Sequence, residues 1–127
     1  MQQNNNKTVL IVDDEKLIAQ ALTEKLASVG FTVETASDGE EALLKASQLK
    51  PDLILLDIIM PKLDGISALK KLKAQDATKN IPVIILSNLY DDEKVTEVIN
   101  SGGTDYLVKV EHTLSDIVAK VKEKLNL

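Results

Sequence analysis

The stretch DLILLDIIMPKLDG, residues 52–65, decides the fold because its continuous apolar run ends abruptly in one carboxylate. The run DLILL, residues 52–56, is apolar after its first residue and predicts a strand buried on both faces, as in a parallel sheet covered by helices. Gly65 marks the turn at which the next helix starts. Asp57 stands where the strand leaves the core. Taken alone, Asp57 is most simply a solvated loop residue, and the alternative is that Asp57 is a nucleophile.

The same order of strand and helix recurs along the chain. Four further runs predict strands, over residues 8–12, 31–36, 81–86 and 104–109. Apolar residues at helical spacing predict helices over 13–30, 37–49, 66–72, 91–103 and 113–125. Ser37 and Glu40 have the spacing of a capping box at the second helix, and Thr113 and Asp116 have it at the last helix.

The strand compositions also predict the strand order. The runs over 8–12, 52–56 and 81–86 are solidly apolar and belong at the centre of the sheet, whereas 31–36 alternates and 104–109 begins with polar residues. Right-handed crossovers then place helices on both faces. The predicted fold class is α/β, with a three-layer, doubly wound, five-stranded parallel sheet in the order 2-1-3-4-5.

Length and composition limit the classes of function. The 127 residues suit one domain over 7–127, and the polar residues 1–6 predict a disordered tail. No apolar run reaches the length of a membrane span and no signal peptide is present, so we expect a cytoplasmic protein without a membrane partner. The net charge of -5 disfavours direct nucleic-acid binding. The absence of cysteine excludes disulfides and thiolate metal sites.

Polar residues collect at the predicted carboxyl ends of the strands, where open parallel sheets bind ligands. They are Asp13 and Asp14 after the first strand, Asp57 after the third, Ser87 after the fourth and Lys109 at the end of the fifth. Each has a simpler interpretation alone: a helix cap for the aspartate pair, a loop carboxylate, a turn hydroxyl and an exposed lysine. Their joint position at one edge of the sheet predicts a site.

The chemistry of this set favours phosphoryl transfer. Three carboxylates repel one another unless a cation joins them, and Mg²⁺ (or Mn²⁺) prefers such oxygen ligands. Asp57 can attack phosphorus to form an aspartyl phosphate. Lys109 would offset phosphoryl charge and Ser87 would donate a hydrogen bond. All fifteen basic residues are lysines, so no guanidinium group takes part.

Four motifs resemble those of the receiver domain of two-component response regulators, of the CheY-like, single-domain kind. They are VLIVDDE (9–15), DLILLDIIMPKLDG (52–65), VIILS (83–87) and TDYLVK (104–109), and the resemblance runs from about Lys7 to Leu125. It implies the flavodoxin-like (βα)5 receiver fold, for which the order 2-1-3-4-5 is already known. It also implies that Asp57 accepts a phosphoryl group from a histidine kinase, a histidine phosphotransfer protein or a small phosphodonor.

The resemblance assigns further roles to individual residues. Asp13, Asp57 and the backbone carbonyl of Ile59 would bind the metal ion, with Asp14 binding directly or through water. Ser87 and Tyr106 would form a switch that reshapes the surface made by residues 91–103, 104–109 and 113–125. Without the resemblance, Tyr106 is most simply an edge-strand aromatic with its hydroxyl in water. Candidates for tuning the reaction rate are Ile59, Asn88 and Leu89.

Two positions depart from the family pattern. Val110 stands where the family usually has proline after a cis bond, so we expect a trans Lys109–Val110 bond. Asn88 replaces the usual small residue beside the switch hydroxyl, and it is expected either to narrow access to Asp57 or to position an attacking water. His112, the only histidine, is expected to be exposed, just outside the last helix and without a catalytic role.

The favoured function is a signalling switch, not an enzyme, whose only chemistry is self-catalysed phosphoryl transfer and dephosphorylation. Its output partner is open, as is the choice between a monomer and a weak dimer through the switch surface. A stand-alone receiver and a piece of a longer protein both fit the chain. The alternatives are a phosphorylation-independent interaction module and, less favoured, an aspartyl-phosphate phosphohydrolase. The hydrolase is disfavoured because no cap segment and no second aspartate closely follow Asp57.

Overall fold

A single parallel sheet forms the centre of the protein. The computed structural model describes residues 6–58, 63–88 and 92–127. Within them, the strands in chain order are β1 (Thr8–Val12), β2 (Thr32–Ala36), β3 (Leu53–Leu56), β4 (Val83–Ser87) and β5 (Asp105–Val108). They lie in the order β2-β1-β3-β4-β5, and all neighbouring pairs are parallel. The predicted fold class and strand order are confirmed.

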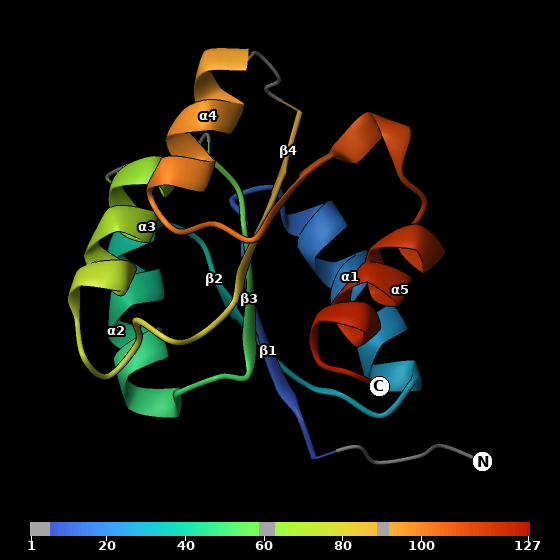
Figure 1. Ribbon diagram of the computed structural model, residues 1–127. Helices are drawn as coiled ribbons and strands as arrows, with labels where there is room; N and C mark the ends of the chain where they lie inside the picture. The colour runs from blue at the N-terminus through green and yellow to red at the C-terminus, as the bar shows by residue number, and fades with distance from the viewer. Residues whose placement is uncertain (1–5, 59–62, 89–91) are drawn as a thin grey trace.

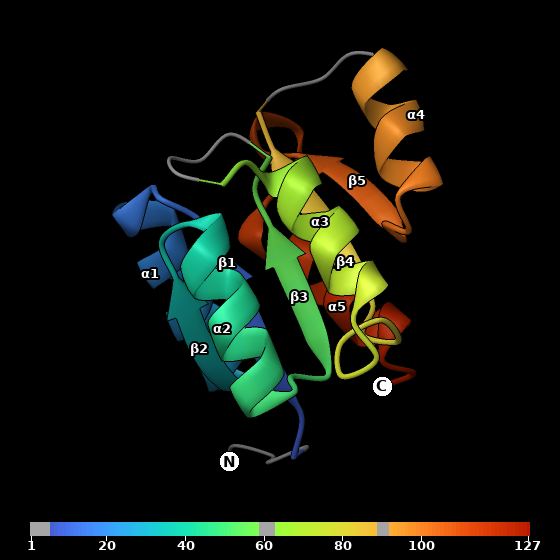
Figure 2. The same ribbon diagram turned by 90° about the vertical axis from the view of Figure 1, so that its left-hand side faces the viewer.

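Helices cover both faces of the sheet, giving the three predicted layers. They are α1 (Lys16–Ser28), α2 (Gly39–Leu49), α3 (Gly65–Ala74), α4 (Asp92–Asn100) and α5 (Leu114–Lys124), with a short 3-10 turn, η1 (Lys109–Glu111), before the last. Figures 1 and 2 show α1 and α5 on one face and α2, α3 and α4 on the other. No helix in the described part of the chain has both the length and the apolar character that crossing a membrane requires.

Alternating residues of the central strands belong to two separate hydrophobic clusters, one on each face of the sheet. Leu10 of β1 belongs to the cluster under α2, α3 and α4, whereas the next residue, Ile11, belongs to the cluster under α1 and α5. Successive strand side chains point to opposite faces, so a strand between two helical layers is apolar along most of its length. This is why β1, β3 and β4 are continuous apolar runs.

The start of α2 differs from the prediction. Asp38, not Ser37, is the N-cap residue, and its side chain accepts a hydrogen bond from the Glu41 backbone N–H at 2.9 Å. The Glu41 carboxylate in turn accepts from the Ser37 backbone N–H at 3.0 Å. The predicted Ser37–Glu40 box is therefore wrong by one residue, because the helix begins at Gly39, so the residue before it is the one positioned to cap.

The other predicted helix start and the backbone expectation are confirmed. Thr113 and Asp116 form the predicted capping box at α5, with hydrogen bonds of 3.1 and 3.0 Å. The fifth strand, predicted to reach Lys109, ends at Val108, which pairs with the last residue of β4, Ser87. Lys109 has no strand residue to pair with and begins η1 instead. No peptide bond between described residues is cis, as expected for Lys109–Val110.

Candidate functional site

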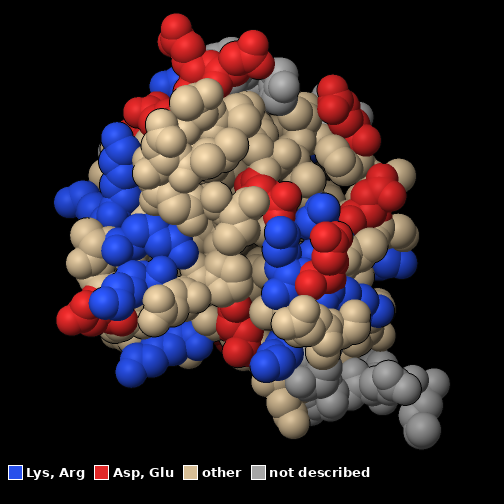
Figure 3. All heavy atoms as spheres, in the orientation of Figure 1, with Lys and Arg blue, Asp and Glu red and all other residues tan. Residues whose placement is uncertain are grey.

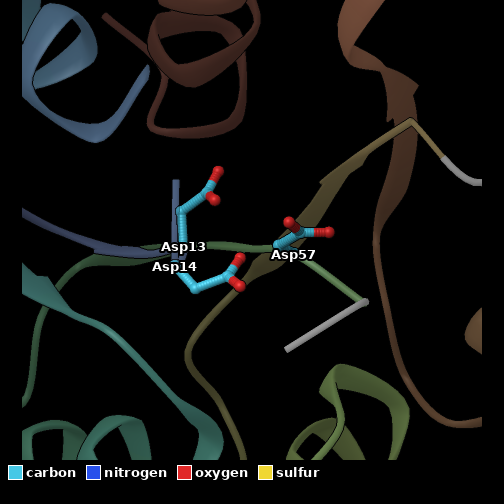
Figure 4. Close-up of side chains that lie close together, drawn as sticks. All are labelled: Asp13, Asp14 and Asp57. Carbon is cyan, nitrogen blue, oxygen red and sulfur yellow. The ribbon is translucent and has the colours of Figure 1, made fainter. Parts of the chain in front are cut away.

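The topology brings the predicted carboxylates together at one edge of the sheet. The neighbours β1 and β3 end at paired residues, Val12 and Leu56, so Asp13 and Asp57 emerge side by side. The Asp57 backbone N–H donates to the Val12 carbonyl at 3.0 Å, which extends this pairing by one residue. One carboxylate oxygen from each of Asp13, Asp14 and Asp57 lies within 4.8 Å of the other two. Figure 4 shows the three side chains close together.

A lysine ammonium is held among these acids. Lys109 Nζ lies 2.7 Å from Asp13 Oδ2 and 3.1 Å from Asp57 Oδ2. The side chains of all three residues are no more than 6% exposed, whereas Asp14 is exposed. A buried charge must be paired, and this pairing explains how two carboxylates and an ammonium are tolerated at the edge of the core.

Glu15 is a fourth acidic member that the sequence interpretation did not assign to the site. Its Oε1 lies 2.7 Å from Lys109 Nζ, and its side chain is 49% exposed. The signal was present, since Glu15 is the third acid of the VLIVDDE motif. However, a residue at a helix start is equally typical of a solvated side chain, and only the approach of Lys109 from β5 distinguishes the two.

Burial and pairing shift the protonation equilibria of the site in definite directions. Burial raises the pKa of Asp13 above its ordinary value, although hydrogen bonds from Lys109 and from the Glu15 backbone oppose this. Burial on its own lowers the pKa of Lys109, but hydrogen bonds to Asp13, Glu15 and Asp57 outweigh it and raise that pKa. Lys109 therefore stays protonated, while the charged form of Asp13 is disfavoured by its burial.

The donor set suits a hard divalent cation. Asp13, Asp14 and Asp57 offer only oxygen ligands, and together with Glu15 they place four carboxylates beside one ammonium, an excess of three negative charges. Mg²⁺ prefers oxygen ligands and is commonly held by one or two carboxylates, with water completing its shell. The described residues therefore fit the metal-binding prediction. The backbone carbonyl of Ile59 lies outside the described residues.

An open cleft gives access to the Asp57 carboxylate. It has a volume of about 290 Å³ and is lined by Asp14, Glu15, Asp57, Ser87 and Asn88. Ser87 is fully buried at the end of β4, and its neighbour Asn88 is exposed. The predicted hydroxyl and the predicted rate-tuning amide thus both line the space in front of Asp57. The third tuning candidate on this side, Leu89, lies outside the described residues.

Gly65 packs closely against the backbone of the phosphoacceptor candidate, Asp57, and of its neighbour Ile58. The Gly65 backbone N–H donates to the Ile58 carbonyl at 2.8 Å. A Cβ atom on Gly65 would lie 2.1 Å from the Asp57 carbonyl oxygen and 2.5 Å from the Ile58 Cα. Asp64 caps α3 by accepting from the Ser67 backbone N–H at 2.9 Å. The predicted turn at Asp64–Gly65 therefore starts the helix, and it also needs glycine for close backbone approach.

Two further residues lie outside the carboxylate cluster. Tyr106 is half-buried and packs against the hydrophobic cluster under α2, α3 and α4, so its ring is not a fully exposed edge aromatic. It pairs with Ile85, two residues before Ser87.

His112 is half-buried, not exposed as expected. Its ring turns toward the backbone, with Nδ1 3.0 Å from the Val108 carbonyl oxygen. His112 precedes α5, outside the site, as predicted.

The distribution of charge on one face bears on nucleic-acid binding. On the face shown in Figure 3, lysine side chains gather in two places, on the left near α2 and α3 and at the lower right near α5, and acidic side chains lie next to both groups. Nucleic-acid binding is typically supported by a continuous basic patch or stripe. On this face, acidic side chains interrupt the lysine groups.

Comparisons with known proteins point to one family. Residues 9–122 match the family model described as the response regulator receiver domain. The alkaline phosphatase synthesis transcriptional regulatory protein PhoP of Bacillus subtilis is 45% identical over 82% of this chain and 42% of its own length. PrrA of Mycobacterium tuberculosis, a transcriptional regulatory protein, is 42% identical over 92% of this chain and 49% of its own length. The chain thus spans about half the length or less of these curated relatives.

Solved structures agree in fold and in sequence. The receiver domain of the Francisella response regulator 1452 is 41% identical, with a TM-score of 0.84, covering 93% of this chain and 95% of that one. The Borrelia burgdorferi structure described as a CheX-CheY-BeF3-Mg complex is 34% identical, with a TM-score of 0.86, covering 94% and 89%. With the family match over most of its length, this chain belongs to the response regulator receiver domain family.

Proposed function

We propose that Asp57 is the phosphoacceptor of a phosphorylation-controlled switch formed by residues 7–127. The observation that carries this proposal is the position of its carboxylate. The Asp57 carboxylate is buried at the end of a central strand and hydrogen-bonded to Lys109, yet it lines an open cleft of about 290 Å³. A structural carboxylate would not need this cleft, whereas a nucleophile must be reached by its substrate.

The chemistry is a displacement at phosphorus. A carboxylate oxygen of Asp57 forms a bond to the phosphorus atom, and the bond from phosphorus to the donor breaks. The leaving group keeps the electron pair, which gives a neutral imidazole from a phosphohistidine whose other ring nitrogen carries a proton, and acetate from acetyl phosphate. Lys109 and Ser87 donate hydrogen bonds to phosphoryl oxygens in the transition state. Hydrolysis of the aspartyl phosphate by water returns the carboxylate.

The metal site belongs to the same proposal. Asp13, Asp14 and Asp57 would hold Mg²⁺ or Mn²⁺, with Ile59 contributing its carbonyl as expected from the family. When bound, the divalent cation supplies positive charge that offsets the charge of the transferring phosphoryl group. The chain's own residues orient the carboxylate and exclude bulk water from behind it, since Asp57 is only 4% exposed.

The switch involves Ser87 and Tyr106. Ser87 moves toward the phosphoryl group. The ring of Tyr106, which already packs against the hydrophobic cluster under α2, α3 and α4, turns further inward beside β4. This alters the surface made by α4, β5 and α5, which would bind the output partner or a second copy of the chain. A histidine kinase or a histidine phosphotransfer protein would supply the phosphoryl group. Ile59, Asn88 and Leu89 remain candidates for tuning its lifetime.

The test is the mass of the intact protein after incubation with acetyl phosphate and Mg²⁺. We expect one phosphoryl addition in the wild type, lost with a chelator and in Asp57→Asn. Asp76→Asn is a matched control, because Asp76 is 96% exposed and pairs only with the nearby Lys79 in the described structure. An adduct that persists in Asp57→Asn would refute the assignment.

The same experiment separates the alternatives. If no adduct forms, release of inorganic phosphate would indicate rapid turnover, as in a phosphohydrolase. Absence of both would favour a phosphorylation-independent interaction module. Following the decay of the adduct in Asn88→Ala tests the tuning role of Asn88, and an unchanged decay rate would remove it.

A further inference from the structure

The ammonium of Lys109 has all three of its donors committed. An ammonium group carries three N–H bonds. Three carboxylate oxygens lie within hydrogen-bonding distance of Lys109 Nζ: Asp13 Oδ2 at 2.7 Å, Glu15 Oε1 at 2.7 Å and Asp57 Oδ2 at 3.1 Å. While Asp57 is still a carboxylate, an incoming phosphoryl oxygen can gain a hydrogen bond from Lys109 only if one of these partners gives up its own.

Glu15 is the partner that can leave at the lowest cost. Before the bond to phosphorus forms, Asp13 and Asp57 are both carboxylates whose side chains are only 3% and 5% exposed, so moving either one away from the ammonium would weaken the charge pairing of a buried group. The Glu15 side chain is 49% exposed and can exchange the ammonium for water. Exposed ion pairs contribute little to stability, so this exchange is easily reversed.

The backbone around Glu15 is fixed, while its side chain serves no helix-capping role. The Glu15 N–H donates to Asp13 Oδ1 at 2.9 Å, and its carbonyl accepts from the Ala19 N–H at 3.1 Å. Glu15 is the N-cap residue of α1, but its side chain makes no capping hydrogen bond. The local helix therefore does not account for its position over Lys109. The side chain also lines the cleft in front of Asp57.

We propose that Glu15 is a displaceable blocking residue that slows phosphorylation of Asp57. In the unphosphorylated protein it occupies one Lys109 N–H and adds negative charge at the mouth of the cleft. On phosphorylation, a phosphoryl oxygen takes over that N–H and the Glu15 carboxylate turns to water, still ionised. Only hydrogen bonds are exchanged in this step. The inference rests on the proposed role of Asp57, and in it Glu15 acts on the reaction through Lys109 rather than by contact with phosphorus.

The test compares the rate of Asp57 phosphorylation by acetyl phosphate, with saturating Mg²⁺, in wild type and variants. Glu15→Ala removes both the bond and the charge, and we expect a rate about two- to fivefold above wild type, the range expected for one exposed ion pair. Glu15→Gln keeps an acceptor for Lys109 without the charge and is expected to fall between the two. Glu24→Gln is the matched control, because Glu24 is an exposed glutamate of the same helix.

Ionic strength provides a readout that a purely structural role would not change. Added salt screens the repulsion between Glu15 and an anionic donor, so the wild-type rate should rise with salt more steeply than the Glu15→Ala rate. Far-ultraviolet circular dichroism checks that each variant is folded. A rate for Glu15→Ala equal to or below wild type would overturn the inference while leaving Asp57 as phosphoacceptor. A wild type that is never phosphorylated would overturn both.

Discussion

Replacing Lys109 with methionine tests how the site is held together. The Lys109→Met substitution keeps an unbranched side chain of similar length but removes the charge shared by Asp13, Glu15 and Asp57. The side chains of Lys109, Asp13 and Asp57 are no more than 6% exposed. Removing one partner of a buried ion pair costs about 3–5 kcal/mol, because the remaining charge is left uncompensated.

The assay is urea unfolding at neutral pH with a chelator present, so that no divalent cation replaces the ammonium. With a slope of about 2 kcal/mol/M, a loss of about 4 kcal/mol lowers the unfolding midpoint by about 2 M. The control is Lys120→Met. Lys120 pairs with Glu123 at 3.3 Å, and their side chains are 30% and 64% exposed. This exposed pair should contribute no more than about 0.5 kcal/mol.

A second substitution identifies the cause of the loss. Adding Asp57→Asn to Lys109→Met removes one of the uncompensated carboxylates, so it should recover part of the lost stability. Lowering the pH should also narrow the gap from wild type, because protonated carboxylates no longer need the ammonium. If Lys109→Met unfolds at the wild-type midpoint, or if Asp57→Asn gives no recovery, the described pairing does not stabilise the fold.

Three other predictions concern separate features. Asp38→Ala should lower the free energy of unfolding by about 1 kcal/mol, whereas Ser37→Ala should change it by less than half as much, because only Asp38 caps α2 through its side chain; equal effects in urea unfolding would contradict this. Gly65→Ala should cost at least about 1–3 kcal/mol and slow phosphorylation, because its Cβ would clash with the Asp57 carbonyl; a wild-type melting temperature and rate would refute it. Burial raises the pKa of Asp13 above its ordinary value of 3.8. Protonated Asp13 therefore makes its full contribution to the free energy of unfolding below pH 3.8, and this contribution is lost as the pH rises through the raised pKa. Asp13→Asn should therefore be more stable than wild type at neutral pH in chelator, and this advantage should shrink toward about pH 4 in pH-dependent unfolding.

The parts of the fold that could be predicted were those set by one-dimensional patterns. The continuous apolar runs of β1, β3 and β4 follow from burial on both faces, which is typical of the centre of a parallel sheet covered by helices. Capping at Thr113 was predicted correctly. At α2, Ser37 and Asp38 are both competent caps, and the choice between them depends on where the helix begins in the packed structure.

The amino-acid sequence by itself determined which chemical groups reach the edge of the sheet, because parallel strands all end there and the residue at or just after each strand end can be read directly. Asp13, Asp57, Ser87 and Lys109 were found in this way. Only the tertiary structure decided how they are paired. Lys109 follows β5 and Glu15 lies 94 residues earlier at the start of α1, yet Nζ and Oε1 are 2.7 Å apart. Such a contact depends on the direction in which a long side chain leaves its element, and sequence patterns record the order of residues but not that direction.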